Sequence, residues 1–486
     1  MSHMPVFAGG FMYSPTTVYR CYSFFFPPLQ TVNLLGVSYG TISGWSSSAL
    51  PALQSPLDSP LQRHGAITQE EASWIAGTLC LGGVLGTLVG GVLVERLGRK
   101  WTAWTAGLPL VACWTLIIVA DHPGHLMGAR FLGGLGGGIV YVANPLYVSE
   151  IAAPKHRGAL SSMLVLSCCV GMEVAYTTAA FLPYRTIPWV SIVIPLVFLI
   201  GFVFVPESPL HLASIQKHEE AERSLRYFRG VPAVKGTTVP EEFERELRQL
   251  ERMCTDPQST KQSLDRQLTW SDFNSPHAKR AFLISLTLMV LNQFCGCFYM
   301  MNYAESVFAE SSSTLSLSAN RSVIVVGLIQ LCGCYSCTLL VDRMGRKILL
   351  VISALGTALG HSVFAAYCYG QYAGYDLTML SWLPLVCFSV VIFIGSLGLG
   401  TIPFVVLAEI MPLKIKGFAT TFCMVINWTV AFVALKYFSL VAIAFGMYGL
   451  LLFFAFCSTA GAIFVMFVMP ETKGKDFQEI QKLMDR

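Results

Sequence analysis

The sequence contains the triplet Cys-Gly-Cys twice, at 295–297 and 332–334, and each copy lies close to an amide side chain. Paired cysteines at this spacing could bind a metal ion, form a disulfide or act as a redox switch. The amides at 292, 293 and 330 offer a different chemistry, because a side-chain amide both donates and accepts hydrogen bonds. Which chemistry applies depends on the elements that hold these residues.

The composition is that of a membrane protein. The chain has 486 residues, is 54% hydrophobic and 12% charged, and has a mean hydropathy of +0.59, whereas soluble domains are about 25% charged. About 20 apolar residues cross a bilayer core of ~30 Å. We therefore predict an all-α polytopic membrane protein with twelve helices, in two groups of six, at roughly 30–54, 73–94, 101–120, 126–148, 159–181, 187–205, 281–308, 321–341, 348–370, 382–408, 418–436 and 446–468. No cleavable signal peptide is apparent in residues 1–20.

The basic residues predict an orientation. If both termini are cytoplasmic, 27 of the 32 Lys and Arg fall in cytoplasmic segments, as the positive-inside rule requires. The net charge of +4 reflects this bias and does not indicate a nucleic-acid partner.

The chain divides into four regions: a first bundle at 1–206, a linker at 207–278, a second bundle at 279–469 and a tail at 470–486. The linker holds apolar residues at helical spacing among charges, which predicts two or three amphipathic cytoplasmic helices. The alternative is a solvated, charged linker.

Three motifs occur once in each bundle. ERLGRK at 95–100 recurs as DRMGRK at 342–347, Glu-x6-[Arg/Lys]-Gly begins at Glu150 and again at Glu409, and PES at 206–208 is echoed by PET at 470–472. The two bundles are therefore predicted to be parallel repeats, which place a substrate at the midplane and work by rocking one half against the other.

Opposite charges in these motifs predict ion pairs at the cytoplasmic helix ends that latch the inner gate and break when the cavity opens inward. The alternative is ordinary positive-inside anchoring. The candidates are Glu95, Arg96, Arg99, Glu150 and Arg157 in the first half, and Asp342, Arg343, Arg346, Glu409 and Lys416 in the second.

The chain resembles the sugar-porter branch of the major facilitator superfamily. The resemblance rests on GVLVERLGRK, RFLGGLGGG, PLYVSEIAAPKHRG, PESP, TIPFVVLAEIMP and PETKG, and covers essentially the whole chain. GWSSSALPALQSPLDSPL followed by ITQEEASWIAG is similar to insect facilitated trehalose transporters. This resemblance implies a twelve-helix bundle in the plasma membrane with a central, alternately accessible sugar cavity.

A sugar site needs amides and aromatic rings, because a sugar is a ring of hydroxyls with an apolar face. Together with the resemblance, this makes Asn292, Gln293 and Gln330 the first candidates for substrate binding. The further candidates are Val165, Phe298, Phe404, Asn427 and Trp428, with Asn302 and Tyr303 at the outer gate. The alternative for any single amide is that it joins two helices.

Several positions depart from the sugar-porter pattern. Asn292 stands where a Gln is usual, Phe298 for an Asn, Val165 for a helix 5 Gln, Phe404 for a Trp, and Ser396 for a Glu. Glucose is therefore less expected as the substrate, and a disaccharide, a polyol or another ligand stays open.

Proton-coupled sugar porters carry an Asp in helix 1, where this chain has Ser38. This favours facilitated diffusion, with Glu173 in helix 5 as a possible proton site. A non-transporting sugar sensor and a carrier of another organic solute are the alternatives. Only about sixteen residues follow Pro470, which favours transport over a long-tailed sensor. We expect no enzymatic activity, no cofactor and no obligate protein partner beyond the sugar and the bilayer.

The helical context argues against a metal site at the cysteines. Successive residues rotate by ~100° on a helix, so the two cysteines of one triplet point in opposite directions. Both triplets lie on predicted helices, so no metal or redox function and no disulfide framework are expected. A glycosylation sequon begins at Asn320, almost at the membrane surface.

Overall fold

The computed structural model describes residues 27–56, 59–61, 64–152, 157–231, 241–255, 273–305, 319–412, 415–473, 475 and 479. These residues form helices and connecting turns, with no strand among them. The helices are α2 (Pro27–Gln54), α3 (Gln69–Leu97), α4 (Arg99–Ile118), α5 (Pro123–Ile151), α6 (Arg157–Phe181), α7 (Ile187–Ser191), α8 (Val193–Phe202), α9 (Pro209–Ser214), α10 (His218–Arg229), α11 (Glu241–Thr255), α14 (Pro276–Phe294), α15 (Cys297–Asn302), α17 (Ala319–Met344), α18 (Arg346–Tyr372), the 3-10 helix η2 (Thr378–Leu380), α19 (Leu383–Leu397), α20 (Ile402–Ile410) and α21 (Lys416–Val468).

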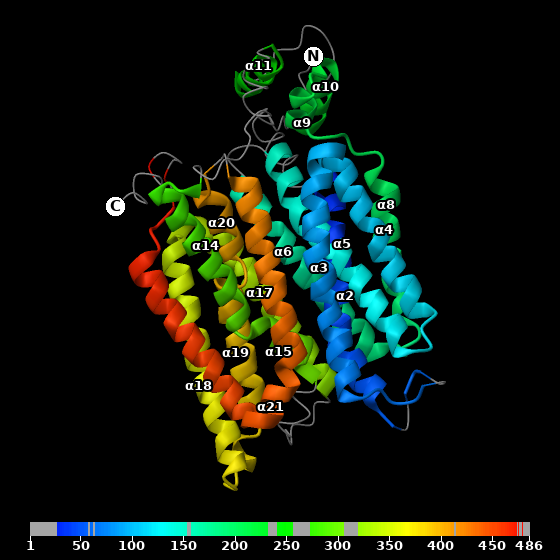
Figure 1. Cartoon of the computed structure of the whole chain (residues 1–486), viewed down its shortest axis with the longest axis vertical. Coiled ribbons are helices and arrows are strands. Elements are labelled where there is room, and N and C mark those ends of the chain that lie inside the picture. The colour runs from blue at the N-terminus through cyan, green and yellow to red at the C-terminus, as the bar shows by residue number, and fades with distance from the viewer. Residues whose placement is uncertain are drawn as a thin grey trace, which may run out of the picture.

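Two helical halves stand side by side (Figure 1). The first half contains α2 to α8 and the second α14 to α21, while α9 to α11 project beyond one end of the bundle, which we call the linker end. The opposite end is the far end. The halves meet where α3 packs on α21, α6 on α17 and α2 on α15. The linker helices have a small apolar core of their own around Ala213 and Phe243.

Ten spans in the described part are long and apolar enough to cross a membrane. Helices cover most of the described part of every predicted stretch, but 418–436 and 446–468 both fall in α21, which is kinked at Gly446 (φ +72°). The two stretches outside the ten are α2 and the pair α7–α8, whose apolar run Ile187–Phe202 is shorter. Helix α2 is polar because it buries hydroxyl groups, including Ser38, Thr41 and Ser46, against its neighbours.

Glycines allow α3 and α5 to pack backbone to backbone. A Cβ atom at Gly82 or Gly86 would overlap carbonyl groups of α5, and one at Gly134 or Gly138 would overlap the backbone of α3. Small residues at a four-residue spacing allow membrane helices to approach this closely.

Two predicted spans are broken near the middle of the second half. Helix α14 ends at Phe294 and α15 begins at Cys297, with Gly296 between them at φ +80° and ψ −17°. The expectation that both Cys-Gly-Cys triplets lie on continuous helices is therefore wrong for the first. The other break separates α19 from α20 and contains Gly398 and Gly400.

Candidate functional site

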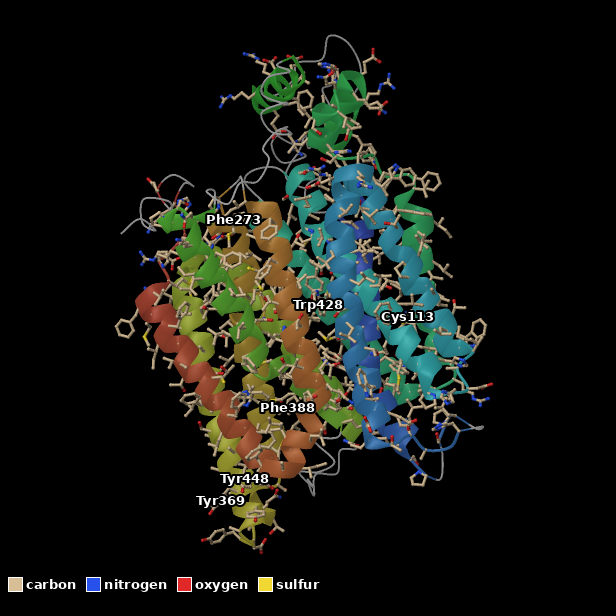
Figure 2. All side chains as sticks on the ribbon, viewed as in Figure 1. Cys113, Phe273, Tyr369, Phe388, Trp428 and Tyr448 are labelled. Atoms are coloured by element: carbon tan, nitrogen blue, oxygen red, sulfur yellow. The ribbon has the colours of Figure 1, made fainter. Side chains whose placement is uncertain are left out.

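A cavity of about 130 Å³ lies between the two halves. Trp428, which lines it, sits about midway along the bundle (Figure 2). The structure brings together all eight residues that the sequence suggested for substrate binding. They lie on α6 (Val165), α14 (Asn292 and Gln293), α15 (Phe298), α17 (Gln330), α20 (Phe404) and α21 (Asn427 and Trp428).

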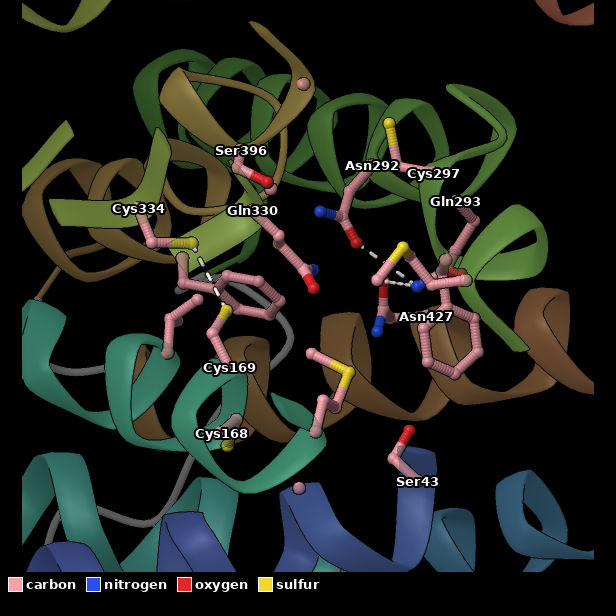
Figure 3. A pocket seen from close by; sticks show the side chains of 18 of the residues that line it. Ser43, Cys168, Cys169, Asn292, Gln293, Cys297, Gln330, Cys334, Ser396 and Asn427 are labelled. Carbon is pink, nitrogen blue, oxygen red and sulfur yellow. Dashed lines mark hydrogen bonds between the residues drawn. The ribbon is translucent and has the colours of Figure 1, made fainter. Parts of the chain in front are cut away.

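Three amides form a hydrogen-bonded cluster on one wall of the cavity (Figure 3). Gln293 Nε2 donates to Asn427 Oδ1 at 2.9 Å and to Asn292 Oδ1 at 3.1 Å, and Gln293 Oε1 accepts from the Tyr299 hydroxyl at 3.3 Å. Asn292 Nδ2 donates to the carbonyl of Leu399 at 2.7 Å, in the break between α19 and α20. The cluster therefore connects α14, α15 and α21 to the point where α19 ends.

The first half contributes residues that the sequence did not single out. Tyr39 and Ser43 of α2 and Tyr141 of α5 line the cavity. Tyr39 and Tyr141 pack edge-on against Trp428, with ring centroids 6.1 and 5.8 Å apart, and Tyr141 also contacts Phe404 at 5.9 Å. Tyrosines and serines are common in helices, so only the rotation of α2 and α5 in the bundle could have identified these residues.

Some cavity-lining side chains hold a buried polar atom with no partner among the described residues. These atoms are the hydroxyl of Tyr39, Oε1 of Gln330 and Nε1 of Trp428. Buried polar groups in proteins are nearly always hydrogen-bonded, so an exception calls for an explanation. A ligand with several hydroxyl groups could supply the missing partners.

The predicted outer-gate residues lie at the far end and are buried. Asn302 Oδ1 accepts from the Ser46 hydroxyl at 2.9 Å, which joins α15 to α2. The Tyr303 ring stacks on Phe438 at 4.9 Å. Lys436 adds a further contact across the halves, because its Nζ donates to the Ser73 hydroxyl at 2.8 Å. The contacts of Asn302 and Lys436 hold the halves together at the far end, and the Tyr303–Phe438 contact lies within the second half.

At the linker end, the predicted ion pairs form within each half. Arg99 Nε lies 2.9 Å from Glu150 Oε1 in the first half, and Arg346 Nη2 lies 2.9 Å from Glu409 Oε1 in the second. Arg346 also faces Asp342 at 3.2 Å. Each pair joins helices of the same half, so these contacts stiffen a half and do not bridge the two.

The other predicted latch residues are placed differently. Glu95 and Arg96 are exposed and form no ion pair with a described residue. Arg343 is exposed, and Lys416 begins α21 half-buried. The side chain of Arg157 lies outside the described residues.

The PES and PET motifs complete this arrangement, in a role that was not predicted from the sequence. The carboxylate of Glu207 accepts the backbone N–H groups of Arg99 and Lys100, at 3.2 and 2.9 Å, which caps the start of α4. Glu471 accepts the backbone N–H groups of Arg346 and Lys347, both at 3.0 Å, at the start of α18. A carboxylate at a helix N-terminus is stabilised by these free N–H groups and by the helix dipole.

The residue after each capping glutamate binds the neighbouring ion pair. The Ser208 hydroxyl donates to Glu150, and the Thr472 hydroxyl donates to Glu409 at 2.7 Å. The three repeated motifs thus meet at one point in each half. The repetition of Glu-Ser and Glu-Thr in the sequence was the pattern that could have identified Glu207 and Glu471.

Burial perturbs two titratable groups near the first cap. It raises the pKa of Glu207 above its usual value, against the opposing effect of the N–H groups of Ser208 and Lys100. It lowers the pKa of His211, and the Arg99 charge lowers it further. His211 Nδ1 lies 2.8 Å from Arg99 Nη1, and because a guanidinium only donates, the imidazole accepts and is neutral.

Two charged side chains lie inside the first half or at its interface, Arg130 fully buried and Glu173 half-buried. Arg130 of α5 is completely buried and donates to the carbonyls of Ile42 and Ile75. Glu173 of α6 accepts from the Thr177 hydroxyl at 3.4 Å, and its other oxygen occupies the space beside Gly327 of α17. Asn320, the sequon residue, lies in the first turn of α17, and its side chain is outside the described residues.

The fold is that of the major facilitator superfamily. The proton:xylose symporter XylE bound to 6-bromo-6-deoxy-D-glucose matches with a TM-score of 0.75 and 22% sequence identity, over 96% of this chain and 100% of that one. The inward open conformation of the xylose transporter XylE from E. coli matches with a TM-score of 0.72 and 21% identity, over 94% and 98%.

The chain belongs to the sugar (and other) transporter family, which matches residues 29–484. Among its relatives, the facilitated trehalose transporter Tret1 of Bombyx mori is 33% identical over 93% of this chain and 85% of that protein. The facilitated trehalose transporter Tret1-2 homolog of Drosophila simulans is 31% identical over 93% and 89%. The protein is thus a multi-pass membrane protein of a sugar-transporter family.

Proposed function

We propose that this protein carries a sugar, either trehalose or a hexose, across the plasma membrane by facilitated diffusion with alternating access. The observation that carries the proposal is the cavity between the halves. Its wall holds a cluster of amides beside aromatic rings, and Tyr39, Gln330 and Trp428 each have an unpaired polar atom. Such a site selects hydroxyl-bearing ligands, because a ligand without hydroxyls leaves buried polar groups unpaired.

Facilitated transport is supported by the chemistry of α2. This helix contains no Asp or Glu that could carry a proton, and Ser38 stands at the expected position. The buried Arg130 bonds to backbone carbonyls and not to a carboxylate. The insect relatives are named facilitated trehalose transporters, which agrees with this mechanism.

Glu173 favours a second candidate, transport coupled to protons. Its buried oxygen has no hydrogen-bond partner, and no basic side chain among the described residues pairs with it. It lies where α6 of one half meets α17 of the other, so relative movement of the halves would change its exposure to water. A carboxylate in this situation can bind a proton in one conformation and release it in the other.

The linker end is proposed to be cytoplasmic, with both termini on that side, because most Lys and Arg of the chain lie there. The far end is then extracellular. Since the far-end contacts through Asn302 and Lys436 join the halves, the described conformation is closed toward the outside.

Uptake of labelled trehalose, glucose and fructose into oocytes or proteoliposomes tests the proposal, with and without a pH gradient. We expect uptake of at least one sugar that does not depend on the gradient. Gln293→Ala should raise the KM for that sugar, whereas Gln371→Ala, which removes an amide on α18 that donates to the Tyr367 hydroxyl, should not.

Each alternative predicts a different result. Uptake that is accelerated by a proton gradient in the wild type, but not in Glu173→Gln, would replace facilitated diffusion by proton coupling. Sugar binding without uptake, at normal surface expression, would indicate a sensor. Neither binding nor uptake of any of the three sugars would refute sugar transport by this protein.

A further inference from the structure

Two buried thiols from opposite halves lie against each other. Cys169 of α6 and Cys334 of α17 have their sulfur atoms 3.3 Å apart, and the two residues are 3% and 4% exposed (Figure 3). Cys334 is the second cysteine of the second Cys-Gly-Cys triplet, for which the sequence predicted no redox function because the two cysteines of one triplet point apart on their helix, whereas Cys169 is a partner on another helix. All thirteen cysteines whose surroundings are described are free thiols, so this pair is reduced in the structure.

The pair lies within a continuous contact between the two helices. Toward the linker end, the Ser162 hydroxyl of α6 donates to Thr338 of α17 at 3.2 Å. Toward the far end, Glu173 of α6 occupies the space beside Gly327 of α17. Because α6 and α17 run antiparallel in this register, the two thiols face each other along a packed interface.

The cysteine pair lies at the wall of the central cavity. Cys169 and Cys334 line the central cavity, which the substrate must also enter. Hydrogen peroxide is small and polar enough to enter such a cavity. A disulfide requires the sulfur atoms to approach to ~2.05 Å, so they must close by about 1.2 Å, a movement within reach of side-chain rotation.

We propose that Cys169 and Cys334 form an oxidation site, at which a hydroperoxide joins the two halves through a disulfide and arrests transport. One thiol reduces the peroxide O–O bond, becomes a sulfenic acid and releases water. The second thiol attacks that sulfur, the S–S bond forms and a second water leaves. One hydrogen peroxide and two thiols thus give one disulfide and two waters.

Transport should stop because both cross-linked helices carry residues that line the cavity. Val165 lies one turn from Cys169, Gln330 lies one turn from Cys334, and both line the cavity. Alternating access requires one half to move relative to the other. A covalent bond between α6 and α17 beside the cavity restrains that motion. Only this transport consequence rests on the proposed function.

The cross-link can be measured without any substrate. A protease site is inserted between residues 256 and 272 of the full-length protein, and membranes are treated with hydrogen peroxide. Free thiols are then blocked with N-ethylmaleimide, and the linker is cut with the protease. The products are separated on a denaturing gel without reductant. We expect the two halves to remain joined and to separate after addition of dithiothreitol.

Variants with one cysteine replaced by serine show which cysteines form the cross-link. Cys169→Ser and Cys334→Ser should each abolish the joined product, and Cys334→Ala provides a second test where the serine variant is poorly expressed. The matched control is Cys168→Ser, because the neighbouring Cys168 points toward the Tyr141 hydroxyl, 4.0 Å away. It should retain the cross-link. Separation of the wild-type halves after peroxide treatment would overturn the proposal.

Uptake measured on the same samples tests the functional part. Peroxide should reduce uptake in proportion to the cross-linked fraction, dithiothreitol should restore it, and Cys169→Ser should be insensitive. A cross-link that forms while uptake is undiminished would overturn the arrest. Absence of uptake in untreated membranes would instead count against the proposed transport function, and the gel result would still decide the oxidation site.

Discussion

Replacing Gly98 by alanine tests the contact in which the Glu207 carboxylate caps the start of α4. Gly98 has φ +86° and ψ 179°, and a Cβ atom there would lie 2.6 Å from both Glu207 Oε2 and His211 Nε2. This backbone region is essentially restricted to glycine, and forcing another residue into it costs ~1–3 kcal/mol. Displacing the Glu207 carboxylate from the start of α4 weakens a helix cap by about 1–2 kcal/mol. The expected loss of unfolding free energy is therefore about 2–5 kcal/mol.

Thermal unfolding of the purified protein in detergent measures this loss. A unit of 150–250 residues loses about 2–4 °C in Tm per kcal/mol, so Gly98→Ala should unfold about 4–20 °C lower. Gly345→Ala should behave alike, because Gly345 has φ +93° and its Cβ atom would lie 2.6 Å from Glu471 Oε2. Gly417→Ala is the matched control, since a Cβ atom there meets nothing within 4 Å. It should leave Tm unchanged or slightly raised.

A Tm for Gly98→Ala within about 2 °C of the wild type would refute the reasoning, because both the strain and the lost cap would then be absent. The double variant with Glu207→Ala separates the two contributions. If alanine at 98 acts partly by displacing the Glu207 carboxylate, the two losses should overlap, and the double variant should be about 1–2 kcal/mol less destabilised than the sum.

Three further predictions concern single side chains. Burial lowers the pKa of His211 in the folded protein, so as the pH falls the unfolded chain binds a proton at this residue before the folded protein does. The stability of the folded protein should therefore decline below about pH 6.5. His211→Gln should make this decline shallower when Tm is measured against pH. His361 Nε2 lies 2.9 Å from the carbonyl of Cys295 at the break between α14 and α15, so His361→Ala should lower Tm and uptake together, and His361→Asn, which keeps a donor, should recover part of both. Tyr299→Phe removes the hydroxyl that donates to Gln293 and should raise the KM for the sugar about 2- to 10-fold at unchanged surface level; an unchanged KM would show that this hydroxyl does not position the amide.

The sequence was most informative where a physical rule acts over a short distance. Hydropathy located the helices because each must span the same apolar thickness. The repeated charges predicted contacts at one end of the bundle, and the pairs of Glu150 and Glu409 lie there. The repetition of PES and PET marks Glu207 and Glu471, but the helix N-termini that they cap lie more than a hundred residues away, so the repetition alone does not reveal their capping roles.

Tertiary packing explains what the sequence could not indicate at the cavity. The amides stood out because polar side chains are scarce in apolar spans, whereas Tyr39 and Ser43 belong to a helix rich in polar residues. Glycine is needed at position 296, in the break between α14 and α15, because the ring of Phe454 would lie 2.6 Å from a Cβ atom there. An apolar run that continues through the break gives no indication of it.

The paired caps have a consequence for biosynthesis. The carboxylate of Glu207 is synthesised 108 residues after the N–H group of Arg99 to which it binds, and that of Glu471 is synthesised 125 residues after the N–H group of Arg346. At about 5–20 residues per second, each interval lasts roughly 5–25 s on the ribosome. Each cap therefore closes only when the last helix of its half has been made, and neither needs a residue of the other half. The first half can complete its own assembly in the membrane while the second is still being translated.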